Sequence, residues 1–174
     1  KMIVHVKSET EVRLVSAFNG DMDRWELATA KARVPEIQLN RFMDQENFII
    51  QMQSMFIETP DKAIVMQVAG NVEDKTVMNY GDDGVTQKAT IKSGLASMED
   101  VFVPNPVTLQ PFRTFHEISQ PEISFVFRMK NSQSGVSCAL FEADGGAWKF
   151  NAVHSIAEYL KKELEGVENV AVLS

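Results

Sequence analysis

The sequence has few of the residues that bind metals or form disulfides: one cysteine, Cys138, and three histidines. A single cysteine cannot form an intramolecular disulfide, so a reducing compartment is the default expectation. We interpret Cys138 as a small buried residue of a strand, the common role of a free cysteine. His5, His116 and His154 stand apart, without the i+3 or i+4 partners of zinc motifs. The sequence therefore predicts no metal site and no cofactor.

Long apolar runs are also missing. No stretch approaches the roughly 18 to 20 uninterrupted apolar residues of a membrane span. Residues 2–6 are too short for the apolar core of a signal peptide. We therefore expect a protein without membrane contacts. A length of 174 residues fits one domain over residues 1–174, and the start at Lys1, almost directly in a strand, also fits a fragment of a longer chain.

Basic residues are fewer than acidic residues. The net charge of −7 disfavours general attraction to nucleic acids or anionic membranes. A local basic patch remains an alternative, because two pairs of basic residues each share one strand face, with a fifth in the preceding loop. Beside the aromatic residues of 112–115, such a patch would have the composition of a single-strand groove. The candidate nucleic-acid contacts are Lys88, Lys92, Arg113, Arg128 and Lys130. A solvated sheet face is the favoured interpretation of these residues.

Nucleophilic catalysis has no recognisable motif in the chain. Ser134-Gly135 and Ser93-Gly94 are hairpin turns, without the strand-turn-helix setting of a nucleophile elbow. Cys138 can be paired with a histidine only by residue type. Gly145-Gly146, before the closing helix, lacks the surrounding pattern of a P-loop or a dinucleotide fingerprint. We predict no catalytic residues.

Two clusters of carboxylates are explained by local structure. Asp82-Asp83 lies at a predicted hairpin tip, where aspartate and glycine are the residues that turns require. Its spacing lacks the alternating oxygen ligands of a calcium loop. Glu142 and Asp144 precede a predicted helix, where negative charge is favourable. The sequence therefore predicts that the protein is not an enzyme.

The segment 123–163 has the clearest secondary-structure pattern. Ile123, Phe125, Phe127 and Met129 alternate with more polar residues, which predicts a half-buried antiparallel strand. The turn at 131–135 and the apolar run 136–143 complete a hairpin. Apolar residues at four-residue steps then predict a helix over 148–164, ended by Gly166, with Glu158 and Lys162 paired one turn apart.

The rest of the chain alternates between β and helical patterns. Residues 2–6 and 11–15 predict an opening hairpin, and 25–32 a third strand, with a helix as the alternative. A helical stretch opens at Pro35-Glu36. Thr59-Pro60-Asp61 predicts a second helix over 60–71, with a buried strand as the alternative.

From residue 74 onward the period changes to two. Residues 76–92 predict a hairpin around a turn at 81–84. Residues 101–103 and 107–109 predict short strands, separated by prolines that indicate an edge or a crossover. The result is an α+β domain: a mainly antiparallel sheet of six to eight short strands, helices within 36–71, and a C-terminal helix near 148–164.

Part of the chain resembles the YfdQ-like family of phage and prophage proteins. The resemblance lies in Phe102-Val103-Pro104, Val107-Thr108-Leu109, Pro111-Phe112 and the strand 125–129, and its element order extends over about residues 2–164. It implies a temperate-phage origin, a bacterial cytoplasm and a link to recombination or to a host factor. The family has no established catalytic residues to transfer.

These observations predict a phage-derived, non-enzymatic accessory protein that acts through protein–protein contacts with a host or phage partner. Exposed edges of short strands favour self-association as a homo-oligomer. The alternative is a single-stranded-DNA-binding accessory of a phage recombination system, which requires the basic strand faces to be contiguous.

Overall fold

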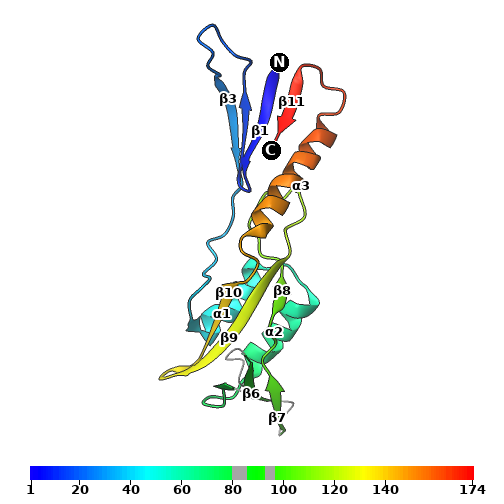
Figure 1. Ribbon diagram of the computed structural model, residues 1–174. Helices are drawn as coiled ribbons and strands as arrows, with labels where there is room; N and C mark the ends of the chain where they lie inside the picture. Colours follow the sequence, from blue (N-terminus) through cyan, green and yellow to red (C-terminus); the bar gives the residue numbers. More distant parts are fainter. Residues whose placement is uncertain (80–85, 93–96) are drawn as a thin grey trace. The chain divides into compact units, whose positions relative to one another are not determined.

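The computed structural model describes residues 1–79, 86–92 and 97–174 and has two compact units (Figure 1). Unit 1 consists of Lys1–Pro35, Phe112–Pro121 and Gly146–Ser174, and unit 2 of Glu36–Pro111 and Glu122–Gly145. The described residues contain three helices and eleven strands, which confirms the predicted α+β class. The single domain over 1–174 stays a prediction.

Unit 1 is a four-stranded sheet with one helix. The strand order is β11-β1-β2-β3, antiparallel except for the parallel pair β1 and β11. The predicted opening hairpin and third strand are confirmed, so the helical alternative for 25–32 is wrong. The last strand, a run of four residues, was not predicted. The elements are β1 (Met2–Ser8), β2 (Glu11–Val15), β3 (Glu26–Lys31), α3 (Ala147–Glu163) and β11 (Val170–Leu173).

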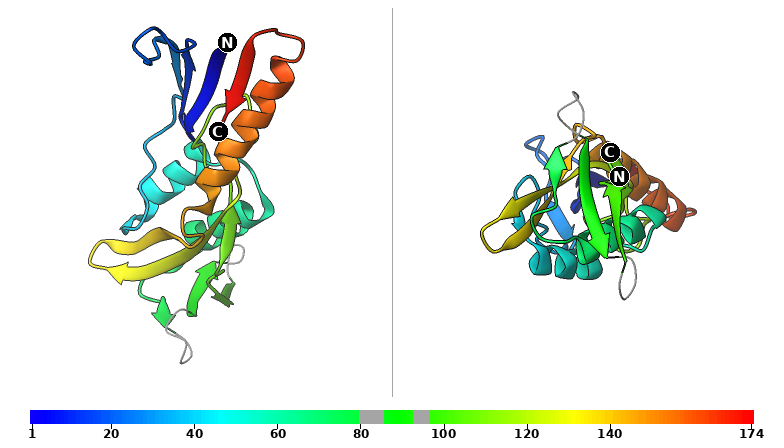
Figure 2. Two further views of the ribbon diagram at one scale, coloured as in Figure 1. Left: turned by 45° about the horizontal axis from the view of Figure 1, so that its top comes forward. Right: turned by 90° about the horizontal axis from the view of Figure 1, so that it is seen from below.

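Helix α3 lies along β1 and β11, as Figure 2 (left) shows. Its buried residues Trp148, Ala152 and Ile156 follow the predicted four-residue step. Ile156 packs in a core cluster with Val6 of β1, because both side chains are apolar and face the space between sheet and helix. The predicted pairing of Glu158 with Lys162 is wrong, since Lys161 Nζ contacts Glu158 Oε1 instead, at 2.8 Å.

Unit 2 contains two sheets rather than one. A four-stranded sheet has the order β4-β10-β9-β8, and a three-stranded sheet has the order β5-β6-β7. With the sheet of unit 1, the described residues form three sheets and eleven strands, so the single sheet of six to eight strands is wrong. The strands are β4 (Met43–Asp44), β5 (Met78–Asn79), β6 (Gln87–Lys92), β7 (Met98–Phe102), β8 (Val107–Leu109), β9 (Ile123–Ser132) and β10 (Gly135–Glu142).

The prolines at 104 and 106 fall between β7 and β8, which belong to different sheets. Each of these strands is also at the edge of its sheet, so the prolines mark both an edge and a crossover, the two alternatives predicted for them. β5 and β6 pair antiparallel as predicted, but the turn at 81–84, the Asp82-Asp83 cluster and Ser93-Gly94 lie outside the described residues.

The core of unit 2 forms against β9. Ile123, Phe125, Phe127 and Met129 are each at most 1% exposed, which confirms the alternation predicted for this strand. Phe127 stacks on Phe48 of helix α1 (Gln45–Met55), with ring centroids 5.5 Å apart. The hairpin partner β10 follows from residue 135 as expected.

Helix α1 starts at Gln45, ten residues after Pro35, so the predicted helical opening at Pro35-Glu36 is wrong. Asp44 is the N-cap, because its Oδ1 accepts from Asn47 N at 2.9 Å. The residues before it are held in a non-helical conformation by contacts with β10. Asn40, whose φ is +60°, donates from its backbone N to Leu140 O, and its Oδ1 accepts from Glu142 N.

Helix α2 (Pro60–Asn71) confirms the second predicted helix at both ends, so the strand alternative is wrong. Thr59 Oγ1 accepts from Lys62 N at 3.1 Å, and Pro60 occupies the first helical turn. Lys62 is only 2% exposed and donates from Nζ to Phe56 O at 2.8 Å. The Lys62 ammonium group also forms an ion pair with Glu58, so this buried group has two oxygen partners.

Two side-chain amides join the two sheets of unit 2. β8 pairs with β9 only at residues 123–125, so the backbone of Met129 extends beyond that pairing. Met129 N donates to Gln87 Oε1 at 2.8 Å, and Gln87 Nε2 donates to Met129 O at 2.7 Å. Asn131 makes the same two-way contact with the backbone of Val77, at 3.0 and 3.3 Å. Gln87 thus satisfies the edge of β9 at Met129 without another strand, and Asn131 satisfies the backbone of Val77.

Candidate protein-contact surface

The described part of the chain gathers no three His, Cys, Asp or Glu side chains that could hold a metal ion. None of its helices is both long and apolar enough to cross a bilayer. Cys138 is buried on β10, which confirms its predicted role as a small apolar residue. Burial raises the pKa of the Cys138 thiol to about 12.

We expect the Cys138 thiol to resist Ellman's reagent in the folded protein at pH 8. Raising a thiol pKa from 9.0 to about 12 lowers the thiolate fraction about a thousandfold at that pH, and the thiolate is the reactive form. The measurement is thiol release with and without denaturant, with Ser134→Cys in the exposed β9–β10 turn as the accessible control. Equal rates for the native and the unfolded chain would contradict the burial.

Four of the five candidate nucleic-acid contacts lie in unit 2, on two strands of different sheets. On β6, Lys88 Nζ lies 3.1 Å from Asp100 Oδ2, and Lys92 Nζ lies 3.3 Å from Glu73 Oε2. Each of these positive charges therefore has an acidic neighbour.

On β9, Arg128 Nη2 donates to Asn79 Oδ1 at 3.3 Å, and Lys130 Nζ lies 4.2 Å from the centre of the Phe42 ring. Arg113 belongs to unit 1, where its guanidinium lies 4.0 Å from the centre of the Trp148 ring. β6 and β9 are not paired with each other. The nucleic-acid role of these five residues stays a prediction.

Strand β3 is the most exposed strand of unit 1. It lies at one edge of the sheet, and all six of its side chains are exposed. Leu27 is 50% exposed, and Trp25, just before the strand, is 67% exposed. Apolar side chains beside a free backbone edge are typical of surfaces that bind another strand.

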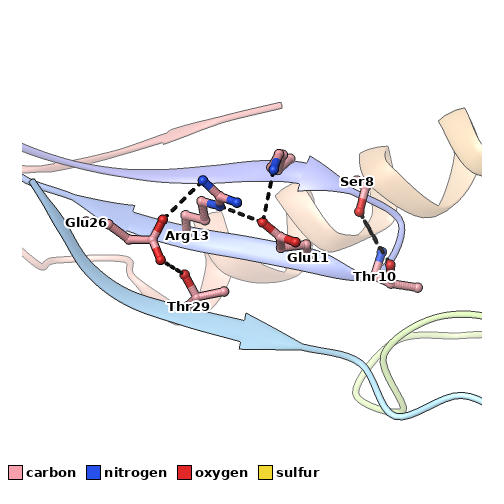
Figure 3. A network of polar contacts seen from close by, with 7 residues as sticks. Ser8, Thr10, Glu11, Arg13, Glu26 and Thr29 are labelled. Atoms are coloured by element: carbon pink, nitrogen blue, oxygen red, sulfur yellow. Dashed lines mark hydrogen bonds and ion pairs between the residues drawn. The ribbon is translucent and has the colours of Figure 1, made fainter. Parts of the chain in front are cut away.

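A row of polar contacts crosses β1, β2 and β3 on one face of this sheet (Figure 3). Lys7 and Arg13 both contact Glu11, and Arg13 Nη1 reaches Glu26 Oε2 at 3.1 Å. Glu26 also accepts from the hydroxyl of Thr29. The hydrogen bond from Arg13 holds the pKa of Glu11 below its usual value. This row anchors β3 to β2 and holds Glu26 at the edge.

The opposite face of the sheet carries an apolar groove. Its volume is about 220 Å³. Val12 and Ala30 come from the strands, Phe115 and Ile118 from the 112–121 loop, and Leu160 from α3. Because Ala30 belongs to β3, the groove and the free edge adjoin each other.

The 112–121 loop is held in place by buried polar side chains. Thr114 is fully buried and donates from Oγ1 to Glu9 O, in the turn between β1 and β2. Gln120 Oε1 accepts from the backbone N–H groups of Arg113 and Thr114, and its Nε2 donates to Phe115 O at 3.0 Å. These contacts position the loop residues that line the groove.

Sequence reasoning found β3 as a strand but not as a contact surface. Its exposure depends on its place at the end of the strand order, which no local pattern encodes. The signal available in the sequence is composition: Glu26-Leu27-Ala28-Thr29-Ala30-Lys31 lacks the alternation of a half-buried strand.

Comparisons with protein-family models, with curated proteins and with solved structures find no match for this chain. The resemblance to the YfdQ-like family therefore stays a prediction.

Proposed function

We propose that the chain is a non-enzymatic accessory protein, phage-derived and located in the bacterial cytoplasm, that acts through protein contacts and self-associates by strand pairing. The observation that carries this proposal is the free edge of β3, a sheet-edge strand whose six side chains are all exposed. A strand added there would satisfy its outward backbone groups and cover Leu27.

The contrast with unit 2 supports the proposal. There, the amide of Gln87 satisfies the extending edge of β9 at Met129, and the Asn131 side chain satisfies the backbone of Val77. β3 contains no proline, and among the described residues no side chain bonds the outward backbone groups of Thr29 or Lys31. The edge of β9 is therefore protected by side chains of the same chain, whereas the edge of β3 is available to another strand.

Self-association is tested by light scattering after size exclusion, at increasing chain concentration. We expect the mass to approach twice 19.5 kDa. Thr29→Pro should return the mass to that of a monomer, because the N–H of Thr29 points away from β2 and proline removes that donor. Thr29→Val keeps the N–H and is the matched control. Circular dichroism checks that both variants are folded.

The outcomes separate the two functions. A monomeric wild type, or a dimer unaffected by Thr29→Pro, would contradict self-association through β3. A mass increase with a single-stranded oligonucleotide that falls steeply with salt, and is lost in Lys88→Glu, would instead favour the DNA-binding alternative. The acidic neighbour of Lys88 weighs against that result.

A further inference from the structure

The hydrogen-bond pattern shows which groups of β3 face outward. Ala32 N donates to Thr10 O at 2.9 Å, one step beyond the pair Glu11–Lys31. Hydrogen-bonded and non-bonded pairs alternate along an antiparallel ladder. Ala28 and Ala30 therefore bond β2, while the N–H and C=O groups of Thr29 and Lys31 point away from the sheet.

The charges of the strand lie on one face. Glu26 and Thr29 contact each other, so they share a face, and Lys31 follows Thr29 at a two-residue step. Leu14 of β2 pairs with Ala28, and the next residue, Val15, pairs with Glu26. Leu27 is therefore the extra residue of a β-bulge. This bulge places Glu26 on the same face as Lys31, with one charge near each end of the strand.

Lys31 lies opposite Glu11 of β2, but no ion pair joins the two among the described residues, while Glu11 contacts Lys7 and Arg13. Arg13 and Glu11 contact each other and their neighbours, and Glu26 is bound to Arg13 and Thr29. A lysine on a sheet edge normally discourages strand addition, because a partner strand would leave its charge beside apolar or like-charged groups. A partner strand fits only if it presents a carboxylate opposite this position.

We propose that the chain supplies that partner itself: two copies pair their β3 strands antiparallel about a two-fold axis at Thr29, which places Lys31 of each copy beside Glu26 of the other. The proposal rests on the proposed function, since it specifies the register of the same edge. A two-fold axis makes the contact self-complementary, so each charge pair occurs twice.

This register uses the outward groups of both strands. The two Thr29 residues exchange backbone hydrogen bonds at the centre, and Lys31 lies opposite Leu27 of the other copy, next to Glu26. Threonine–threonine pairs across antiparallel strands are favourable. The two-fold pairing also continues each four-stranded sheet into the other, so no edge remains at β3.

The neighbouring registers are poorer. An axis at Ala30 brings the two Lys31 residues to diagonal positions and leaves both Glu26 residues far from them. An axis at Ala28 sets Lys31 opposite Trp25, whose carbonyl already accepts from Ser16 N at 2.9 Å. Only the axis at Thr29 combines backbone pairing at Lys31 with a carboxylate beside its ammonium group.

Charge reversal tests the register. Glu26→Lys and Lys31→Glu should each weaken self-association at least about tenfold, because each sets like charges together twice. An equimolar mixture of the two variants should form mixed dimers in preference to either homodimer, since both contacts are then attractive. Native mass spectrometry with one variant labelled with ¹⁵N counts the three species. Lys162→Glu, an exposed reversal on α3, is the control and should leave the dimer unchanged.

The result distinguishes this proposal from the proposed function. Preferred mixed dimers, and recovery of the dimer in the doubly reversed chain, support the register. A wild-type dimer that Thr29→Pro dissociates, combined with a statistical mixture of the two charge variants, overturns the register and leaves self-association through β3 in place. A wild type that stays monomeric overturns both. Circular dichroism and thermal unfolding of each variant exclude loss of fold as the cause, since Glu26 also contacts Arg13.

Discussion

Replacing Phe127 with alanine lowers the free energy of unfolding by about 3–5 kcal/mol, the loss expected for a fully buried aromatic side chain. Phe127 has no exposed surface and stacks on Phe48, with an angle of 18° between the rings. Truncation leaves a cavity between β9 and α1 that neither element can close, because both are fixed by their own backbone hydrogen bonds.

Urea unfolding followed by circular dichroism measures this loss. Phe150→Ala is the matched control, since Phe150 is 81% exposed on α3 and its removal should change stability by less than about 0.5 kcal/mol. A loss below about 1 kcal/mol for Phe127→Ala would show that the space between β9 and α1 is not packed as described.

Replacing Gln87 with leucine costs about 2–4 kcal/mol, because it leaves the N–H and C=O of Met129 buried without partners. Gln87 is 4% exposed, and its amide makes both of these contacts at 2.7 and 2.8 Å. Leucine fills a similar volume, so the loss reports on hydrogen bonding rather than on a cavity.

Two measurements separate this effect from a general loss of stability. Hydrogen exchange of the Met129 amide should accelerate by more than the exchange of the Phe127 amide, which lies two residues along the same strand. Gln133→Leu, in the exposed β9–β10 turn, is the control and should change neither. Unchanged exchange at Met129 would mean that the two sheets of unit 2 are held together by other contacts.

The elements that the sequence predicted correctly are those with local signals. The alternation in β9, the cap at Thr59 and the four-residue step of α3 each act within a few residues, so their patterns survive in the fold. Where a contact with a distant side chain determines the backbone conformation, the local pattern predicts the wrong secondary structure. Residues 36–43 have helical spacing, yet contacts of Gln51 and Asn40 hold this segment in a non-helical conformation.

The division into sheets was not predictable for the same reason. The separation of β6 from β9 depends on which strands pair, and the amide of Gln87 that bridges them looks like any other strand residue in the sequence. The candidate contact surface was missed because exposure of β3 follows from strand order. The sequence of β3 does carry one charge near each end. These charges indicate a pairing register only when the bulge at Leu27, which places them on the same face, is known.

The pairing of β1 with β11 has a consequence for how the chain folds during synthesis. Unit 1 is assembled from three separate segments, and both segments of unit 2 emerge from the ribosome before α3 and β11. Unit 2 can complete its core while β1 still lacks its helix and its parallel neighbour, so Val4 and Val6 remain exposed until α3 and β11 are made. Within this sequence β1 thus precedes both segments of unit 2 but is buried only after them, and a strand left waiting in this way is open to chaperones and to aggregation.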